Sequence, residues 1–143
     1  RPDIAIGTDI IVGFPGESDD DFAQTLSAVR EAAFAYVHQF TYSSRSGTPS
    51  STIKECDPDT VAARSASLRK LSADCAARYS RSFVGKTDMA VIEREGDGVA
   101  ARTGHYLLLP VSAESSVSPG TYCAISIIEQ NGVMTAVPIP PVN

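Results

Sequence analysis

The stretch GTDIIVGFPGESDDDF, residues 7–22, decides the fold, because it joins a β-strand to a helix through a tight turn. Residues 4–14 form a nearly continuous run of apolar and β-branched side chains, which is typical of a strand covered on both faces. A glycine and a Pro-Gly pair then end the strand. Asp9 is the exception in this run, because a buried carboxylate is costly unless it is paired or lies at the open end of the strand.

The acidic residues after the turn indicate the start of a helix. Ser18 is a favourable N-cap, and Asp21 three residues later permits a capping-box arrangement. Negative charges in the first turn also interact favourably with the helix dipole. We interpret the acidic run as helix-start chemistry and not as a metal site, because Mg²⁺ and Ca²⁺ need converging oxygens rather than adjacent ones.

A second strand is predicted over residues 36–43, YVHQFTYS, which are rich in aromatic and β-branched side chains. Strand, helix and strand in this order form a βαβ unit, which implies a parallel sheet with a right-handed crossover. Residues 43–51 are a loop by composition. A long helix is predicted from Asp57 to about Ser82, and its basic residues, Arg64, Arg69, Lys70, Arg78 and Arg81, are expected on a solvated face.

After Gly85 the chain changes character. Short β segments alternate with turn signals at GDG, SPG and NG, which predicts a compact antiparallel barrel. The fold class is therefore α/β plus all-β. We expect α/β units over residues 1–55, a connecting helix over 56–82 and a small OB-like β-barrel over 83–143.

The composition indicates an ordinary globular chain of 143 residues, 43% hydrophobic and 20% charged. No apolar run reaches the roughly 20 residues that span a bilayer, so we expect no membrane association and a cytoplasmic location. The net charge of -5 argues against a broad nucleic-acid surface but not against a local one. The chain lacks an initiator methionine, and we expect it to be a piece of a larger protein.

The three cysteines, Cys56, Cys75 and Cys123, form no short-spaced pair. Neither a zinc site nor a disulfide framework is therefore predicted.

A ligand site is predicted where the two parallel strands end, because ligands of α/β sheets gather at the carboxyl ends of strands. Gly13 would let main-chain groups approach a ligand, and Phe14 could pack on a flat ring. A tight turn without a ligand explains the same residues. In the next loop, Arg45 is flanked by hydroxyl groups and suits a phosphate or carboxylate, although an ordinary polar loop arginine is the other interpretation.

Three motifs give the sequence a family resemblance: residues 2–22, residues 38–51 and SFVGKT at 82–87. The chain resembles the radical S-adenosylmethionine methylthiotransferases, and its β region is similar to their TRAM domain. The resemblance implies that residues 1–55 are the last units of a partial TIM-type barrel. It also implies a set of residues that bind S-adenosylmethionine: Asp9, Gly13, Phe14, Pro15, Glu17, Phe40, Tyr42 and Ser43.

The family's chemistry would involve two 4Fe-4S clusters and S-adenosylmethionine, which splits to a hydrogen-abstracting 5′-deoxyadenosyl radical. The family holds its radical cluster on a three-cysteine C-x-x-x-C-x-x-C loop that this chain lacks. We therefore predict that the longer protein is an enzyme, that this fragment alone is inactive and binds no cofactor, and that it contains no catalytic residue.

The resemblance implies tRNA, near the anticodon, as the partner, and no DNA. Residues 38–50 favour N6-threonylcarbamoyladenosine as the target base, with isopentenyladenosine as the alternative. The candidate substrate contacts are Arg45, Lys86, Arg102 and Tyr106. After Ser82 the chain holds three basic and six acidic residues, which is unexpected for an RNA-binding barrel.

A rival hypothesis is a non-enzymatic RNA- or protein-binding module without an adenosyl ligand. In either case, the exposed edges of an incomplete barrel could let the fragment self-associate.

Overall fold

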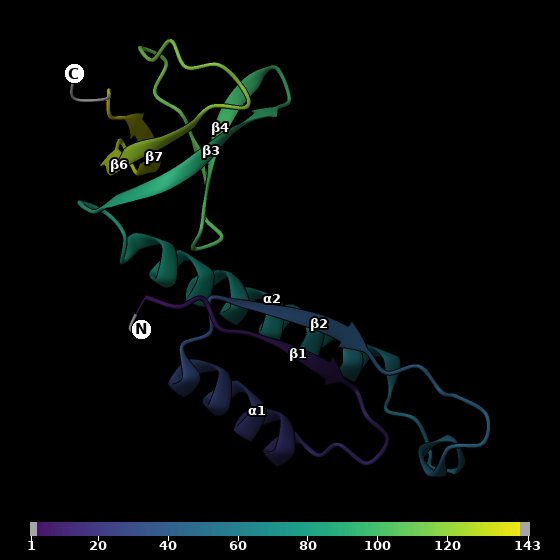
Figure 1. The fold of residues 1–143 in the computed structure, drawn as a ribbon. Helices are drawn as coiled ribbons and strands as arrows, with labels where there is room; N and C mark the ends of the chain where they lie inside the picture. The colour runs from purple at the N-terminus through teal and green to yellow at the C-terminus, as the bar shows by residue number, and fades with distance from the viewer. Residues whose placement is uncertain (1–2, 141–143) are drawn as a thin grey trace. The chain divides into compact units, whose positions relative to one another are not determined.

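The structure is a computed structural model that describes residues 3–140 (Figure 1). The chain divides into two compact units. The α/β unit is Ala5–Tyr79, and the barrel unit comprises Ser80–Asn143 with the segment Arg1–Ile4, as far as these are described. Among the described residues, no helix combines the length and the apolar character needed to cross a membrane.

The α/β unit contains a βαβ arrangement followed by a long helix, as predicted. Its elements are β1 (Gly7–Val12), α1 (Asp19–Ala32), β2 (Tyr36–Thr41), the short 3₁₀-helix η1 (Pro49–Thr52) and α2 (Pro58–Arg81). Strands β1 and β2 pair in parallel, with Ile11 opposite Phe40. The two strands therefore point the same way in Figure 1, and their carboxyl ends lie at one edge of the sheet.

Both helices pack on the same face of this two-stranded sheet. Val12 of β1, Phe22 and Val29 of α1, and Leu68 and Cys75 of α2 form one buried cluster. Helix α2 is thus part of the core of this unit and does more than connect two domains. Burying these side chains stabilises the unit, because each large apolar one contributes roughly 1.5–3 kcal/mol relative to exposure.

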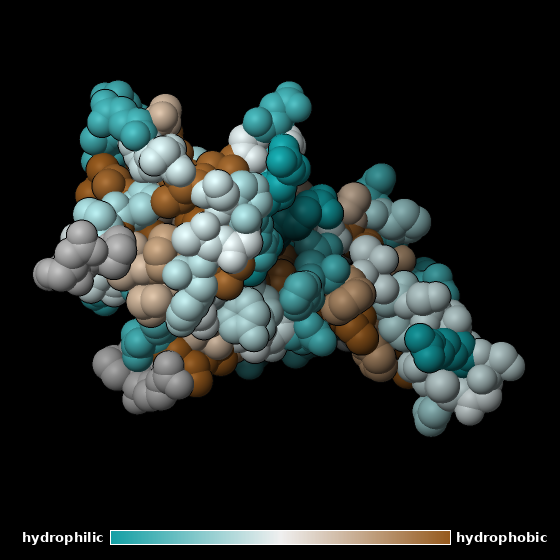
Figure 2. Space-filling view, turned by 45° about the horizontal axis from the view of Figure 1, so that its top comes forward, coloured by the Kyte–Doolittle hydropathy of each residue, from teal (hydrophilic) through white to brown (hydrophobic). Residues whose placement is uncertain are grey.

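The prediction of a strand covered on both faces is wrong for the described residues. Ile11 and Phe40 project from the face opposite the helices and are 52% and 53% exposed. In Figure 2, apolar residues appear in brown among hydrophilic ones on the surface. The open face also explains Asp9, whose carboxylate is exposed and so avoids the burial cost expected from the sequence.

The start of α1 confirms the predicted capping box. The Ser18 hydroxyl accepts a hydrogen bond from the Asp21 N–H, and the Asp21 carboxylate accepts one from the Ser18 N–H. The Ser18 hydroxyl also donates to the Asp21 carboxylate, which lowers the pKa of Asp21. Helix α1 is therefore anchored locally, by residues that the sequence alone identifies.

The barrel unit is a five-stranded antiparallel sheet that nearly closes. Its strand order is β5-β4-β3-β6-β7, and a parallel bridge from Val111 to Ala136 links its two edges. Ile92, Ile125 and Ile127 are buried. The strands are β3 (Thr87–Glu95), β4 (Gly98–Thr103), β5 (Leu108–Pro110), β6 (Tyr122–Gln130) and β7 (Val133–Pro138).

This topology agrees with the small OB-like antiparallel barrel predicted from the sequence. The α/β unit, in contrast, has two parallel strands among its described residues. The wider TIM-type barrel is not shown by them and stays a prediction.

Candidate functional site

A cavity of about 640 Å³ lies at the carboxyl ends of β1 and β2. Parallel strands end at the same edge of a sheet, so the turn after β1 and the loop after β2 converge there. Six residues predicted as ligand contacts line it together with four that were not predicted. The predicted ones are Asp9, Phe14, Phe40, Tyr42, Ser43 and Arg45; the others are Ile11, Thr41, Thr48 and Ser50.

Aromatic rings supply much of the cavity wall. The rings of Phe14 and Tyr42 meet edge to face, with their centroids 5.2 Å apart. The Tyr42 hydroxyl is buried and has no hydrogen-bond partner among the described residues. A buried polar atom without a partner is unusual in a native structure and is expected at a place where a ligand or water supplies the missing bond.

The two charged residues of the cavity have opposite signs. Asp9 lies on β1, and Arg45 lies in the loop after β2. The Arg45 carbonyl is fixed by the Thr48 hydroxyl at 2.8 Å, whereas the Arg45 side chain is exposed and forms no ion pair with any described residue. The cavity therefore combines flat apolar surfaces, hydroxyl groups and an unpaired guanidinium, a set that suits a polar molecule with an aromatic ring.

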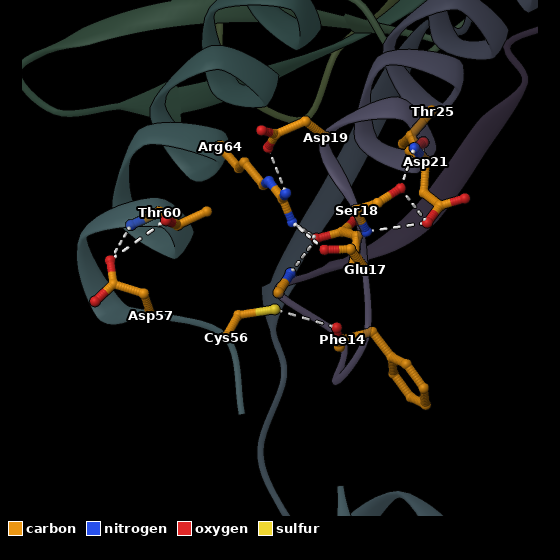
Figure 3. Close-up of polar contacts among 11 residues, drawn as sticks. Phe14, Glu17, Ser18, Asp19, Asp21, Thr25, Cys56, Asp57, Thr60 and Arg64 are labelled. Atoms are coloured by element: carbon orange, nitrogen blue, oxygen red, sulfur yellow. Dashed lines mark hydrogen bonds and ion pairs between the residues drawn. The ribbon is translucent and has the colours of Figure 1, made fainter. Parts of the chain in front are cut away.

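The turn after β1 is held by a polar network that was not predicted from the sequence (Figure 3). Arg64 of α2 donates from Nη1 to the Glu17 carboxylate at 2.7 Å and to the Glu17 carbonyl at 3.0 Å. Its Nη2 donates to the Asp19 carboxylate at 2.7 Å. The expectation that Arg64 lies on a solvated face is wrong, because this residue is only 6% exposed.

Three residues predicted to bind the ligand, Gly13, Pro15 and Glu17, do not line the cavity. Gly13 donates its N–H to the Glu17 carboxylate at 2.9 Å, which commits both groups to the turn itself. Pro15 is buried and does not line the cavity. Gly13 nevertheless has a clear structural role, since its φ is +76° and a Cβ there would lie 2.6 Å from Val61 Cγ2.

The predicted contacts of the barrel unit lie outside the cavity. Arg102 donates from Nε to both oxygens of the Glu93 carboxylate at 2.9 Å, so its charge is already paired. Lys86 Nζ lies 4.9 Å from the centroid of the Phe83 ring. Tyr106 is 75% exposed in a turn, with φ +62°. Tyr106 is therefore accessible for contact with a large partner.

The cysteines do not fit an iron–sulfur cluster. Cys56 Sγ donates to the Phe14 carbonyl at 3.3 Å, Cys75 is buried in the core of the α/β unit, and Cys123 belongs to the barrel unit. Within residues 3–140 no three His, Cys, Asp or Glu side chains converge in a way that could hold a metal ion. A cubane cluster needs several thiolates in one place, and this arrangement does not provide them.

Relatives with known names match most of the chain. It is 38% identical over 129 residues to the tRNA-2-methylthio-N(6)-dimethylallyladenosine synthase of Bartonella bacilliformis, covering 89% of this chain and 28% of that protein. Proteins of the same name from Acidothermus cellulolyticus and Maricaulis maris are 48% and 44% identical, over 68% and 67% of this chain and 20% and 21% of those proteins. The chain thus spans between 20% and 28% of the length of these relatives.

Two further comparisons add little. No family model matches the chain. Among solved structures, an apo form of Mycoplasma genitalium RNase R matches 57% of this chain and 17% of that chain, at 11% identity and a TM-score of 0.37, too low to support an argument.

The names of the relatives agree with the alternative target rather than with the preferred one. All three carry the dimethylallyladenosine name, which corresponds to the isopentenyladenosine alternative and not to the threonylcarbamoyladenosine preference.

Proposed function

Because this chain belongs to the radical S-adenosylmethionine methylthiotransferase family, we propose that the protein containing it attaches a methylthio group to isopentenylated adenosine in tRNA. One observation carries the proposal: the carboxyl ends of β1 and β2 and the segments that follow them line a single cavity. This chain would contribute part of the cofactor site and, through the barrel unit, a contact with the RNA.

We propose that the cavity holds the adenosine part of S-adenosylmethionine. Its volume lies within the roughly 300–1,000 Å³ of ordinary ligand pockets. Phe14 and Phe40 offer apolar surface to the purine ring, while Asp9, Ser43 and the buried Tyr42 hydroxyl offer polar groups to the ribose and the ring edge. When bound, the cofactor supplies the radical chemistry of the family; these side chains bind it, orient it and exclude water.

The iron–sulfur clusters have no fitting ligands in this chain, so none of its residues is assigned to them. The relatives are several times longer, and we propose that the cluster ligands lie in the remainder of the protein. The inactivity of this chain by itself stays a prediction.

Cofactor binding can be tested by calorimetric titration of the full-length protein with S-adenosylmethionine. Phe14→Ala should weaken binding about tenfold, because stacking on an aromatic ring contributes roughly 1–3 kcal/mol per base. Tyr122→Ala is the matched control: this side chain is 66% exposed and lies in the barrel unit, outside the cavity. Equal binding by both variants and the unmodified protein would exclude the cavity as the cofactor site.

The target base can be tested by mass spectrometry of tRNA nucleosides from a strain that lacks the gene. We expect the 2-methylthio derivative of isopentenyladenosine to disappear and unthiolated isopentenyladenosine to accumulate. Loss of the methylthio derivative of threonylcarbamoyladenosine instead would restore the other branch. A complete and unchanged nucleoside profile would favour the rival hypothesis of a binding module.

A further inference from the structure

Arg64 occupies a position of α2 where a charged side chain is not expected. It lies three residues after Val61 and four before Leu68, on the stripe of the helix that faces the core. Arginine is almost never buried unless its charge is paired. The structure provides the partner from 47 residues away in sequence, in the carboxylate of Glu17, whose side chain is 11% exposed.

One guanidinium nitrogen fixes the whole turn. Nη1 of Arg64 bonds to both the side chain and the main chain of Glu17. The same Glu17 oxygen accepts the Gly13 N–H, and the Glu17 N–H donates to the Phe14 carbonyl at 2.9 Å. One bond on the Glu17 carboxylate and one main-chain bond therefore close the turn, and Arg64 is the cation that holds this carboxylate in place.

Overall stability alone does not account for this pair. A buried ion pair often contributes little net free energy, because desolvation offsets the attraction, and an apolar pair of similar volume can be as stable. The Nε of Arg64 is also buried without a hydrogen-bond partner among the described residues. What an apolar pair could not do is hold the Gly13 N–H and the Glu17 main chain in one geometry.

We propose that Arg64 is a positioning residue for the cofactor cavity, an inference that rests on the function proposed above. Arg64 does not line the cavity. It acts through the turn at residues 13–17, which carries Phe14 to the cavity wall. In Figure 3 the Phe14 ring points away from the polar network, so the network holds one side of the turn and the ligand would meet the other.

Asp19 provides a control for the loss of the buried ion pair between Arg64 and Glu17. Asp19 bonds the same guanidinium, but its side chain is 95% exposed, so water screens the pair and its contribution is small. Arg64→Met removes the charge and retains an unbranched side chain, but leaves Glu17 buried and unpaired. The double variant Arg64→Met/Glu17→Leu removes both charges together, which should recover stability without restoring the hydrogen bonds of the turn.

The first measurement is amide hydrogen exchange on this chain. Arg64→Met should reduce the protection of the Gly13 amide about tenfold, the equivalent of one lost hydrogen bond, while Asp19→Asn leaves it within about twofold. The double variant should melt near the temperature of the unmodified chain and still lose this protection. Unchanged protection of Gly13 in Arg64→Met would overturn the proposal; the double variant reports on stability alone, because it also removes the Glu17 oxygen that accepts the Gly13 N–H.

The second measurement uses the full-length protein and its S-adenosylmethionine kinetics. A positioning role predicts that Arg64→Met/Glu17→Leu raises KM for the cofactor about tenfold while kcat at saturation changes less than about threefold. A general loss of folded protein would lower the reaction rate at every concentration of S-adenosylmethionine and leave KM unchanged, and this result would contradict the proposal. Failure of the unmodified protein to bind the cofactor would refute the proposed function itself, whereas normal KM in the double variant refutes only the role of Arg64.

Discussion

Gly13→Ala is the substitution whose cost follows most directly from the structure. Two separate terms contribute. Gly13 has φ +76°, in the left-handed region, where an L-residue is disfavoured by roughly 1–2 kcal/mol. The added Cβ would also lie 2.6 Å from Val61 Cγ2 and 3.2 Å from Val61 Cγ1, and overpacking of this kind costs about 1–3 kcal/mol.

The reduced entropy of the unfolded chain offsets these terms by only about 0.4–1 kcal/mol. We therefore expect Gly13→Ala to lower the free energy of unfolding by about 2–4 kcal/mol. Gly16→Ala separates the two terms, because Gly16 has φ +88° but no heavy atom lies within 4 Å of the position that an added Cβ would take. It should cost about 1 kcal/mol, from backbone strain alone.

Urea unfolding followed by far-ultraviolet circular dichroism measures this difference. The signal comes chiefly from α1 and α2 and so reports on the α/β unit. In a Val61→Ala background, the cost of Gly13→Ala should fall by at least about 1 kcal/mol, because the clashing methyl groups are gone. Equal costs for Gly13→Ala and Gly16→Ala, or an absent coupling with Val61, would refute the contact argument.

Three further predictions concern separate parts of the chain. Ser18→Ala should lower the free energy of unfolding by about 1 kcal/mol, measured by urea titration, because it removes the N-cap of α1. Leu68→Ala should lower it by about 2–5 kcal/mol in the same assay, since this side chain is fully buried. His105 bonds the carboxylates of Asp88 and Asp3, each at 2.7 Å, and its pKa is raised above the ordinary 6.5, chiefly by the hydrogen bond to Asp88. The stabilisation by protonated His105 is therefore full below pH 6.5 and is lost as the pH rises through the folded-state pKa. Urea titrations that follow NMR signals of the barrel unit should show a lower free energy of unfolding at about pH 9 than at about pH 6. This difference should be smaller in His105→Gln.

Features that depend on neighbouring residues could be predicted from the sequence. Ser18 and Asp21 are three residues apart, and this spacing alone defines the capping box at the start of α1. The barrel strands could be predicted in the same way, from short β segments between turn signals. Such features hold because the energies that select them act within one turn or one strand.

The open face of β1 could not be predicted in this way. An apolar run indicates burial but does not say how many layers cover the strand. The exposure of Ile11 and Phe40 depends on where α1 and α2 pack, which is a tertiary property. Asp9 was the available signal, because a carboxylate in such a run is compatible with an open face and costly in a closed one.

The burial of Arg64 has a signal in the sequence. A count of the basic residues in α2 does not separate Arg64 from the others, whereas its position around the helix does. Arg64 alternates with Val61 and Leu68 on the core-facing stripe, and a charged residue on such a stripe predicts a buried ion pair. The partner, Glu17, could not be identified, because nothing local links residues 47 positions apart.

Helix α2 limits the shape of the β1 turn in two independent ways. Val61 occupies the space into which a side chain at residue 13 would project, and Arg64, one helical turn later, holds the carboxylate that closes the turn. Both side chains lie on the same stripe of one rigid element, so they keep a fixed spacing. Gly13 and Glu17 therefore fit the turn for the same reason, because each contacts the surface of α2. The packing of α2 through Leu68 and Cys75 sets the position of that surface. The geometry of the cavity wall at Phe14 thus depends on core residues that no ligand would touch.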